Sequence, residues 1–472
     1  MGVAQFRQDL GLATAITLIV GSMIGSGILI LPGVMAGQLG NSGILLLAWI
    51  LPGLLTIAGA LTFAEMASAY PRAGGQYVFL REGLGRGWSF LYGWSMFWVI
   101  QTGIIAAVAI AFATFVDFFF DLPGQFTPLG PLTVPPWGVA VVAVGCILLL
   151  SAVNYLGVKY GGVVQNVTTA AKVLGIVGLV VGILLFGRPN HDVLGSALVG
   201  APQGAALLSV FGLAVVSALF AYDGWPQATY VAAEVKDAKR NLPRALIIAP
   251  LITMAIYVST VFAYIYALDI GAASAAGRPG GRIAADAALA VLGPTAAAAI
   301  VVVALVSTFG TVNAYVLSSP RVFYALSKDG AFLKSMGKLH PKRATPAFAT
   351  VLMAEWASLL VLTGTYAQLV IVVVFSLWLF YIPTALAYFR LHKDRSVAKP
   401  FTTPGYPVVP LIFLGSAVFI VLNTLLTAPT QALFSLVLIA AGVPVFAWQA
   451  RRAGLPAGRR EWVLAPLGER GT

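Results

Sequence analysis

The chain has 472 residues, of which 59% are hydrophobic and only 9% are charged. A water-soluble protein of 472 residues needs more polar side chains than this to cover its surface. The composition therefore predicts an integral membrane protein. The formal net charge of +12 would also suit a nucleic-acid-binding protein. In membrane proteins, however, basic residues gather on the cytoplasmic side and raise the net charge in the same way.

Apolar runs of about 20 residues recur along the chain, the length that crosses about 30 Å of hydrocarbon as a helix. The sequence lacks the alternation of apolar and polar residues that is typical of a membrane β-barrel. We therefore predict an all-α integral membrane protein with one polytopic domain over 1–472 and twelve spans. They lie at about 11–37, 42–69, 87–119, 136–154, 161–186, 205–233, 243–268, 284–318, 346–363, 366–390, 406–427 and 431–449.

Basic residues are distributed unevenly over the loops between these spans. If the N-terminus is cytoplasmic, 24 of the 28 basic residues lie in inner loops and tails, because only Arg188, Arg278 and Arg282 fall outside and Lys172 falls within the membrane. This asymmetry predicts a cell-membrane protein with both termini in the cytoplasm, and it excludes nucleic acid as a partner. We expect the polar tail 450–472 to face lipid headgroups.

The chain has a single cysteine, Cys146, inside the predicted fourth span. An internal disulfide is therefore impossible, and segment 120–135, expected outside the membrane, offers no cysteine for a link to a partner. The three histidines fall in predicted loops, so we expect no metal cluster. No glycine-rich phosphate-binding loop follows a predicted strand, so we do not expect ATP-driven transport. We expect no cofactor and no enzymatic activity either.

The stretch 21–28, GSMIGSGI, places three glycines and two serines where a membrane helix should be most apolar. The spacing of Gly21 and Gly25 is typical of a helix face that packs closely against a neighbour. The nearby Ser26, Gly27 and Pro32 add more weak helix formers than close packing requires. A deliberate interruption of the helix is the alternative.

A second interruption is predicted five spans later, at Phe220–Pro226, where an acid, a glycine and a proline lie at bilayer depth. Two broken helices in corresponding positions indicate an inverted-repeat transporter with its site at the midplane. Free N–H groups at the start of a half-helix suit a carboxylate, and free carbonyls at the end of one suit an ammonium. The two breaks therefore fit an α-amino acid better than a sugar or an inorganic ion.

Several motifs give the chain a close resemblance to a known family over about residues 10–400. They are GSGI at 25–28, YPRAGGQY at 70–77, FAYDGW at 220–225 with Glu234, RNLPRA at 240–245, and STFGTVN at 307–313 leading to Arg321. On these residues the chain resembles the L-type amino acid transporter branch of the amino acid, polyamine and organocation (APC) superfamily. GSGI is common to the superfamily, whereas FAYDGW followed by Glu and NLPRA is more specific to this branch.

The resemblance implies a LeuT-like fold with two inverted repeats of five helices, at about 11–186 and 205–390, and two accessory helices at about 406–449. It places the substrate carboxylate near the GSG backbone, with further pocket residues on the first and sixth spans. Phe220 is the implied aromatic gate. Pro226 departs from the polar residue that relatives often have there, which leaves the substrate range open. The implied substrate-binding residues are Ser22, Met23, Gly25, Ser26, Gly27, Phe220, Ala221 and Asp223.

Lys172 is the one basic residue predicted at mid-membrane depth, where a charge is costly and seldom accidental. In sodium-independent relatives a lysine at this place approaches spans 1 and 8, where sodium-coupled relatives bind an ion. Ser307 and Thr308 are then its expected hydroxyl partners. Lys172 is either a fixed cation, which favours sodium-independent exchange, or a titrating group, which favours proton symport.

Other polar and aromatic residues allow more than one interpretation. Asp223 would bind a cationic substrate or cap the following half-helix, and Trp378 is a weaker gate candidate than Phe220. We expect Glu65 and Glu234 to pair with loop arginines, and no role is assigned to Glu355.

The predicted function is secondary active transport of amino acids by alternating access. The alternatives are an amine or polyamine carrier of the same superfamily and an amino acid sensor that does not transport. Animal relatives attach a heavy chain through an extracellular cysteine, so the cysteine-free segment 120–135 predicts no disulfide-linked heavy chain.

Overall fold

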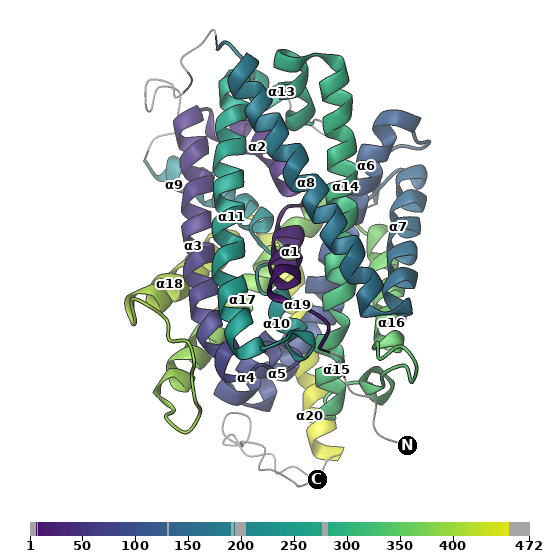
Figure 1. Ribbon diagram of the computed structural model, residues 1–472, viewed down its shortest axis with the longest axis vertical. Coiled ribbons are helices and arrows are strands. Elements are labelled where there is room, and N and C mark those ends of the chain that lie inside the picture. The colour runs from purple at the N-terminus through teal and green to yellow at the C-terminus, as the bar shows by residue number, and fades with distance from the viewer. Residues whose placement is uncertain are drawn as a thin grey trace.

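The computed structural model describes residues 6, 8–129, 132–189, 193, 204–275 and 282–452. The predicted tail lies outside the described residues from residue 453 onward, as does Arg278. Most helices run along the long axis of the molecule (Figure 1). In the described part of the chain, ten helices are long and apolar enough to cross a membrane, which agrees with the predicted polytopic helical protein.

The first half of the chain forms eight helices, with a π-helical segment, η1 (Met96–Ile100), between the fifth and the sixth. Segment 120–135 contains a short antiparallel hairpin, so the described part of the chain is not entirely helical. The helices are α1 (Leu12–Met23), α2 (Gly27–Leu39), α3 (Ser42–Ala69), α4 (Gln76–Leu84), α5 (Arg86–Ser95), α6 (Gln101–Phe120), α7 (Trp137–Leu156) and α8 (Val158–Phe186), and the strands are β1 (Thr127–Leu129) and β2 (Leu132–Val134).

The second half adds twelve helices and two 3-10 turns, η2 (Ala232–Glu234) and η3 (Lys334–Gly337). The predicted spans at 205–233 and 346–363 correspond to the shorter apolar helices α9 and α16. The helices are α9 (Ala205–Ala221), α10 (Gln227–Tyr230), α11 (Ala238–Ala267), α12 (Ile270–Ala275), α13 (Ile283–Leu292), α14 (Pro294–Ser318), α15 (Pro320–Lys328), α16 (Ala347–Val361), α17 (Tyr366–Lys393), α18 (Val408–Thr427), α19 (Pro429–Ala440) and α20 (Gly442–Arg452).

The predicted eighth span, 284–318, is wrong at its start. Two helices occupy this segment, because Gly293 adopts φ +86° between α13 and α14. That left-handed backbone is favourable for glycine but not for residues with a side chain. Pro294, which follows, has a fixed φ that suits the first position of the new helix.

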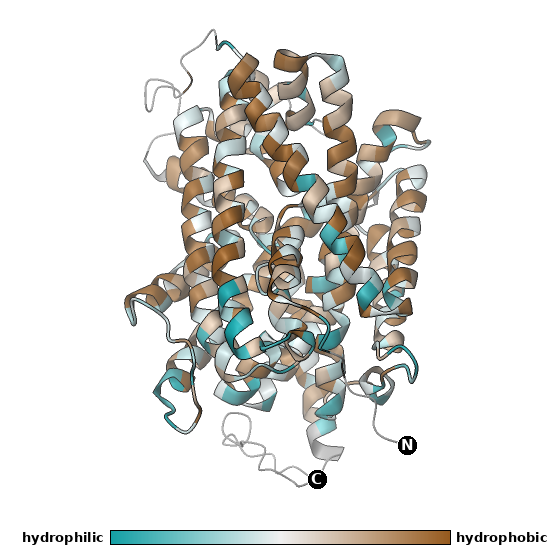
Figure 2. Ribbon diagram, in the orientation of Figure 1, coloured by the Kyte–Doolittle hydropathy of each residue, from teal (hydrophilic) through white to brown (hydrophobic). Residues whose placement is uncertain are grey.

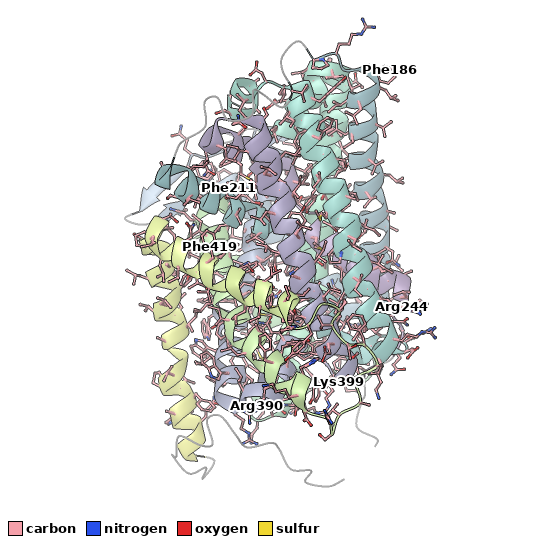
Figure 3. The ribbon with its side chains drawn as sticks, turned by 90° about the vertical axis from the view of Figure 1, so that its left-hand side faces the viewer. Phe186, Phe211, Arg244, Arg390, Lys399 and Phe419 are labelled. Atoms are coloured by element: carbon pink, nitrogen blue, oxygen red, sulfur yellow. The ribbon has the colours of Figure 1, made fainter. Side chains whose placement is uncertain are left out.

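Helix α1 lies at the centre of the bundle, in contact with α8, α11 and α14. Brown, hydrophobic helices fill the middle of Figure 2, and hydrophilic residues gather at its lower end, where α4, α10 and α15 lie. Figure 3 likewise shows Arg244, Arg390 and Lys399 in the lower part of the molecule and Phe186 at the opposite end. We call these the lower and upper ends.

Candidate functional site

The first helix is interrupted within the glycine-rich stretch. Helix α1 ends at Met23 and α2 begins at Gly27, with Ile24 outside helical geometry at φ −76° and ψ 89°. Close packing contributes as well, because a Cβ on Gly21 would lie 1.9 Å from the Gln165 side chain. A Cβ on Gly27 would lie 2.5 Å from that of Ala221. The stretch is therefore both a broken helix and a closely packed face, the two alternatives that its sequence left open.

The second interruption separates α9, which ends at Ala221, from the short helix α10, which begins at Gln227. Gly224 lies between them with φ +107°, and a Cβ there would be 2.8 Å from the backbone of Ser22. A side chain at this position would meet both backbone strain and a steric clash. The two interruptions therefore touch each other backbone to backbone.

Tyr257, on α11, connects the two interruptions. Its hydroxyl lies 2.6 Å from the carbonyl oxygen of Met23 and 3.0 Å from that of Ala221. Both carbonyls belong to the last residue of a half-helix, where no further turn supplies an N–H donor. The buried tyrosine thus supplies a donor that the broken helices need. Sequence reasoning missed it, because one tyrosine in an apolar span carries no distinguishing pattern.

A small cavity, which we call the central cavity, lies between the two interruptions. Its volume is about 10 Å³, room for roughly one water molecule. Seven of the eight residues implied as substrate-binding line it, and four further lining residues were not predicted. The seven are Ser22, Met23, Gly25, Ser26, Gly27, Phe220 and Ala221, and the four are Ile104, Val108, Thr311 and Tyr315.

Asp223, the eighth residue implied as substrate-binding, lies just outside this lining and is 8% exposed. Its carboxylate accepts a hydrogen bond of 2.9 Å from the hydroxyl of Tyr315, which does line the cavity. Buried polar groups need a hydrogen-bond partner, and Tyr315 supplies one to Asp223. The arrangement gives Asp223 a structural partner within the protein.

Aromatic residues close the side of the cavity that faces the upper end. The ring of Phe220 meets that of Tyr366 edge to face, with centroids 5.9 Å apart, and Ser26 Oγ lies 2.9 Å from the Tyr366 hydroxyl. Tyr366, the first residue of α17, was not predicted. Trp378 lies 12 residues further along the same helix, against Tyr381 at 5.2 Å, and is not among the cavity-lining residues.

A buried ion pair closes the lower side. Arg321 Nε lies 2.8 Å from Glu234 Oε1, and both side chains are only 2% exposed. The segment before α1 pairs with the same region, because the Leu10 N–H donates to the Glu234 carbonyl at 3.0 Å. The predicted pairing of Glu234 with an arginine is therefore confirmed.

Glu65 was also expected to pair with a loop arginine, and this prediction is wrong. Its carboxylate lies 2.7 Å from Nδ1 of His392 and accepts from the Tyr388 hydroxyl at 2.9 Å. The backbone N–H of Thr403 donates a third hydrogen bond of 2.9 Å. These partners come from the end of α17 and the loop after it, so the carboxylate joins α3 to that segment.

Lys172 is fully buried beside the first interruption. Its Nζ donates to the carbonyl oxygens of Gly21 at 2.9 Å, Ile24 at 2.6 Å and Ser307 at 2.9 Å. It also lies 3.2 Å from Thr311 Oγ1. The ammonium therefore satisfies the Gly21 and Ile24 carbonyls at the interruption and joins them to Ser307, which lies within α14.

The hydroxyls expected near Lys172 are only partly those found. Ser307 donates to the Ile24 carbonyl at 3.0 Å and shares the lysine's surroundings. Thr308 turns back to its own helix and donates to Ala304 and Leu305. Thr311, one turn beyond Ser307 on α14, lies next to the Lys172 ammonium instead. The described residues contain no group of three metal-binding side chains, here or elsewhere.

Comparison with known proteins identifies the family of this chain. The model of the amino acid permease family matches residues 10–446. The chain belongs to the amino acid permease family. The match covers both interruptions and Lys172. It also covers the residues that close the cavity above and below, which are Phe220, Tyr366, Glu234 and Arg321.

Relatives in the L-type branch confirm the resemblance inferred from the motifs. The serine/threonine exchanger SteT of Bacillus subtilis (strain 168) is 31% identical over 446 residues, which cover 93% of this chain and 96% of SteT. The human b(0,+)-type amino acid transporter 1 is 30% identical, over 93% of this chain and 87% of its own length. Human large neutral amino acids transporter small subunit 2 is 30% identical, with 94% and 81% covered. The family consists of transporters, not enzymes.

Proposed function

We propose that this protein exchanges amino acids across the membrane by alternating access, without sodium, and that the central cavity is its substrate site. The observation that carries the proposal is the meeting of two interrupted helices around a closed cavity next to a buried lysine. The similarity to a serine/threonine exchanger over 93% of the chain supports exchange. The apolar side chains of Ile104 and Val108 in its lining favour neutral substrates, and the cavity has to widen to admit one.

Within this proposal the chain has twelve spans and a LeuT-like arrangement. The ten long helices, together with α9–α10 and α16, give twelve. The interrupted pairs α1–α2 and α9–α10 then begin two inverted repeats, at about 11–186 and 205–390, with two accessory helices at about 406–449. Arg244, Arg390 and Lys399 lie toward the lower end (Figure 3), which supports a cytoplasmic position for that end, and the proposal places both termini there.

The substrate's two charged groups would bind to complementary helix ends. The beginning of α2, at Ser26 and Gly27, presents backbone N–H groups and the positive end of the helix dipole to a carboxylate. The end of α9, at Phe220 and Ala221, presents carbonyl oxygens to an ammonium. Both ends line the central cavity, so one α-amino acid could contact both once the cavity widens.

Phe220 is the proposed gate on the upper side, together with Tyr366. Substrate entry would require the Phe220 ring to leave Tyr366 and the hydrogen bond between Ser26 and Tyr366 to break. On the lower side, the pair of Glu234 and Arg321 would have to separate or move as a unit. Because both sides are closed, the conformation corresponds to an occluded state of the transport cycle.

The amine or polyamine alternative is less well supported. A cationic substrate would need a free carboxylate in the site, and Asp223 already accepts a hydrogen bond from Tyr315. The cavity lining itself carries no acidic side chain. Cys146, the one cysteine of the chain, is buried in α7, which fits the prediction that no heavy chain is attached by a disulfide.

The test uses purified protein in liposomes loaded with unlabelled serine, with uptake of labelled serine measured in sodium or choline buffer. We expect internal serine to accelerate uptake at least about tenfold, with no dependence on sodium or on a pH gradient. Replacement of Ser26 by leucine should abolish uptake while the protein stays folded. Absence of uptake for every loaded amino acid would identify a sensor, and uptake that follows the pH gradient would identify a proton symporter.

A further inference from the structure

A second and larger cavity lies at the side of the bundle and is lined by other residues than the central cavity. It has a volume of about 430 Å³ and lies between α5, η1, α16 and α20, with the loop after α15 at its edge. Helices α5, α16 and α20 all lie in the lower part of Figure 1. The cavity size is in the range of small-molecule sites, which are mostly apolar with a few polar groups.

Three tryptophans form much of this cavity, which we call the tryptophan groove. Trp94 and Trp98 have ring centroids 5.3 Å apart, and Trp98 and Trp356 have centroids 4.7 Å apart in an edge-to-face arrangement. The indole N–H of Trp356 donates to the Trp98 carbonyl at 3.2 Å, and that of Trp94 donates to Leu438 at 2.9 Å. These bonds fix two of the three rings.

The one acidic side chain in the groove lining is Glu355, on α16. It lies eight residues after Ala347, so at 1.5 Å per residue it is about 12 Å along the helix, at hydrocarbon depth. The side chain is exposed on the outside of the bundle. Among the described residues, none forms a hydrogen bond or an ion pair with Glu355.

An ionisable side chain at this depth is costly unless it has a partner. The Trp98 indole N–H is a second polar group without one, since it is buried and has no acceptor among the described residues. The groove thus combines an aromatic wall with a carboxylate that has no partner among the described side chains. Aromatic faces attract cations, and the attraction grows when water is excluded.

We propose that the tryptophan groove binds a hydrophobic organic amine that enters from the lipid. The ammonium would pair with Glu355 and lie against the indole faces, while the apolar body fills the groove towards Leu333 and Val445. An anionic amphiphile would be repelled by Glu355, and a neutral lipid chain would leave the carboxylate unpaired. The site shares no lining residue with the central cavity, so it is distinct from the transport site.

The test measures equilibrium binding of radiolabelled dodecyltrimethylammonium to the full chain in phosphatidylcholine nanodiscs, with binding to empty nanodiscs subtracted. We expect saturable binding with about one site per protein, and no competition by dodecanol, which has the same chain length without the charge. The Glu355→Gln variant should bind the cation at least tenfold more weakly. Glu82→Gln, which alters an acid at the lower end outside the groove, should bind it as the unaltered chain does.

Trp356→Leu provides an independent variant that keeps the carboxylate, and it should also weaken binding several-fold. Unchanged affinity in Glu355→Gln, or equal competition by dodecanol, would overturn the proposal. A nanodisc-bound dimer that binds no cation and dissociates on Glu355→Gln would overturn it in favour of a second copy of the chain. The comparison with dodecanol needs no variant, so the proposal stays testable if a variant fails to fold.

Discussion

Replacement of Lys172 by alanine removes the ammonium that holds the first interruption to α8 and α14. The lysine donates to three backbone carbonyls, of Gly21, Ile24 and Ser307. All three acceptors keep another donor nearby, because the Ser307 hydroxyl lies 3.0 Å from the Ile24 carbonyl and that of Thr311 lies 3.0 Å from the carbonyls of Gly21 and Ser307. The loss is therefore partial for each carbonyl.

The magnitude follows from the cost of a buried acceptor without a partner, about 1–3 kcal/mol. Taking about half of a typical cost of about 1.5 kcal/mol for each of the three carbonyls gives about 2 kcal/mol against the closed conformation. Because about 1.4 kcal/mol is a tenfold change in an equilibrium constant, the population of the closed state relative to open states falls by about 30-fold. We expect the exchange rate to fall by about the same factor.

The assay compares Lys172→Ala with Lys159→Ala, which alters an exposed lysine at the start of the same helix. Serine exchange in liposomes should be lost in the first variant and retained in the second. Propylammonium has the shape and charge of the side-chain atoms that alanine lacks, so we expect millimolar propylamine to restore part of the exchange in Lys172→Ala. Propanol, which is uncharged, should restore none.

Two results would refute this reasoning. Full exchange by Lys172→Ala would show that the ammonium is not needed for the closed state. Equal restoration by propanol would show that the volume of the side chain matters and its charge does not.

Three further variants test the interruptions and their closure. Gly27→Ala should abolish exchange, because its Cβ would lie 2.5 Å from the neighbouring half-helix, whereas Gly145→Ala, with no atom within 4 Å, should transport normally. Tyr257→Phe removes the donor shared by two carbonyls and should lower thermal stability by about 1–3 kcal/mol with reduced exchange; an unchanged melting temperature would contradict this. Glu234→Gln leaves Arg321 buried without its counter-charge and should destabilise the protein by about 3–5 kcal/mol, measured by thermal unfolding in detergent. A stable Glu234→Gln protein would show that the arginine finds another acceptor.

The helical membrane fold could be predicted because a hydrocarbon interior leaves few options. Apolar runs of sufficient length must form helices there, so hydropathy alone locates the spans. The interruption at 24–26 was also accessible, since glycine, serine and proline at that density weaken a helix regardless of its neighbours. Lys172 stood out because a buried cation in a membrane is rare.

Other features depend on packing that the sequence does not display. Tyr257 and Tyr366 act through hydroxyl groups aimed at particular oxygens, but a tyrosine in an apolar span has the same local pattern when it only fills space. The choice of Thr311 over Thr308 as a neighbour of Lys172 follows from helix rotation, which places residues 307 and 311 on one face. The end of α13 at Gly293 was missed because both flanking segments are apolar.

The buried lysine also bears on the energetics of transport. A sodium ion that binds and leaves in each cycle can transfer free energy from its gradient to the substrate, because its binding changes the balance between conformations. A cation attached to α8 by covalent bonds stabilises the first interruption in the same way but never crosses the membrane. It therefore shapes the closed state without supplying a driving force. Within the proposed exchange, net uphill movement of one amino acid is driven by the gradient of another, and a fixed Lys172 agrees with that proposal because it couples no ion.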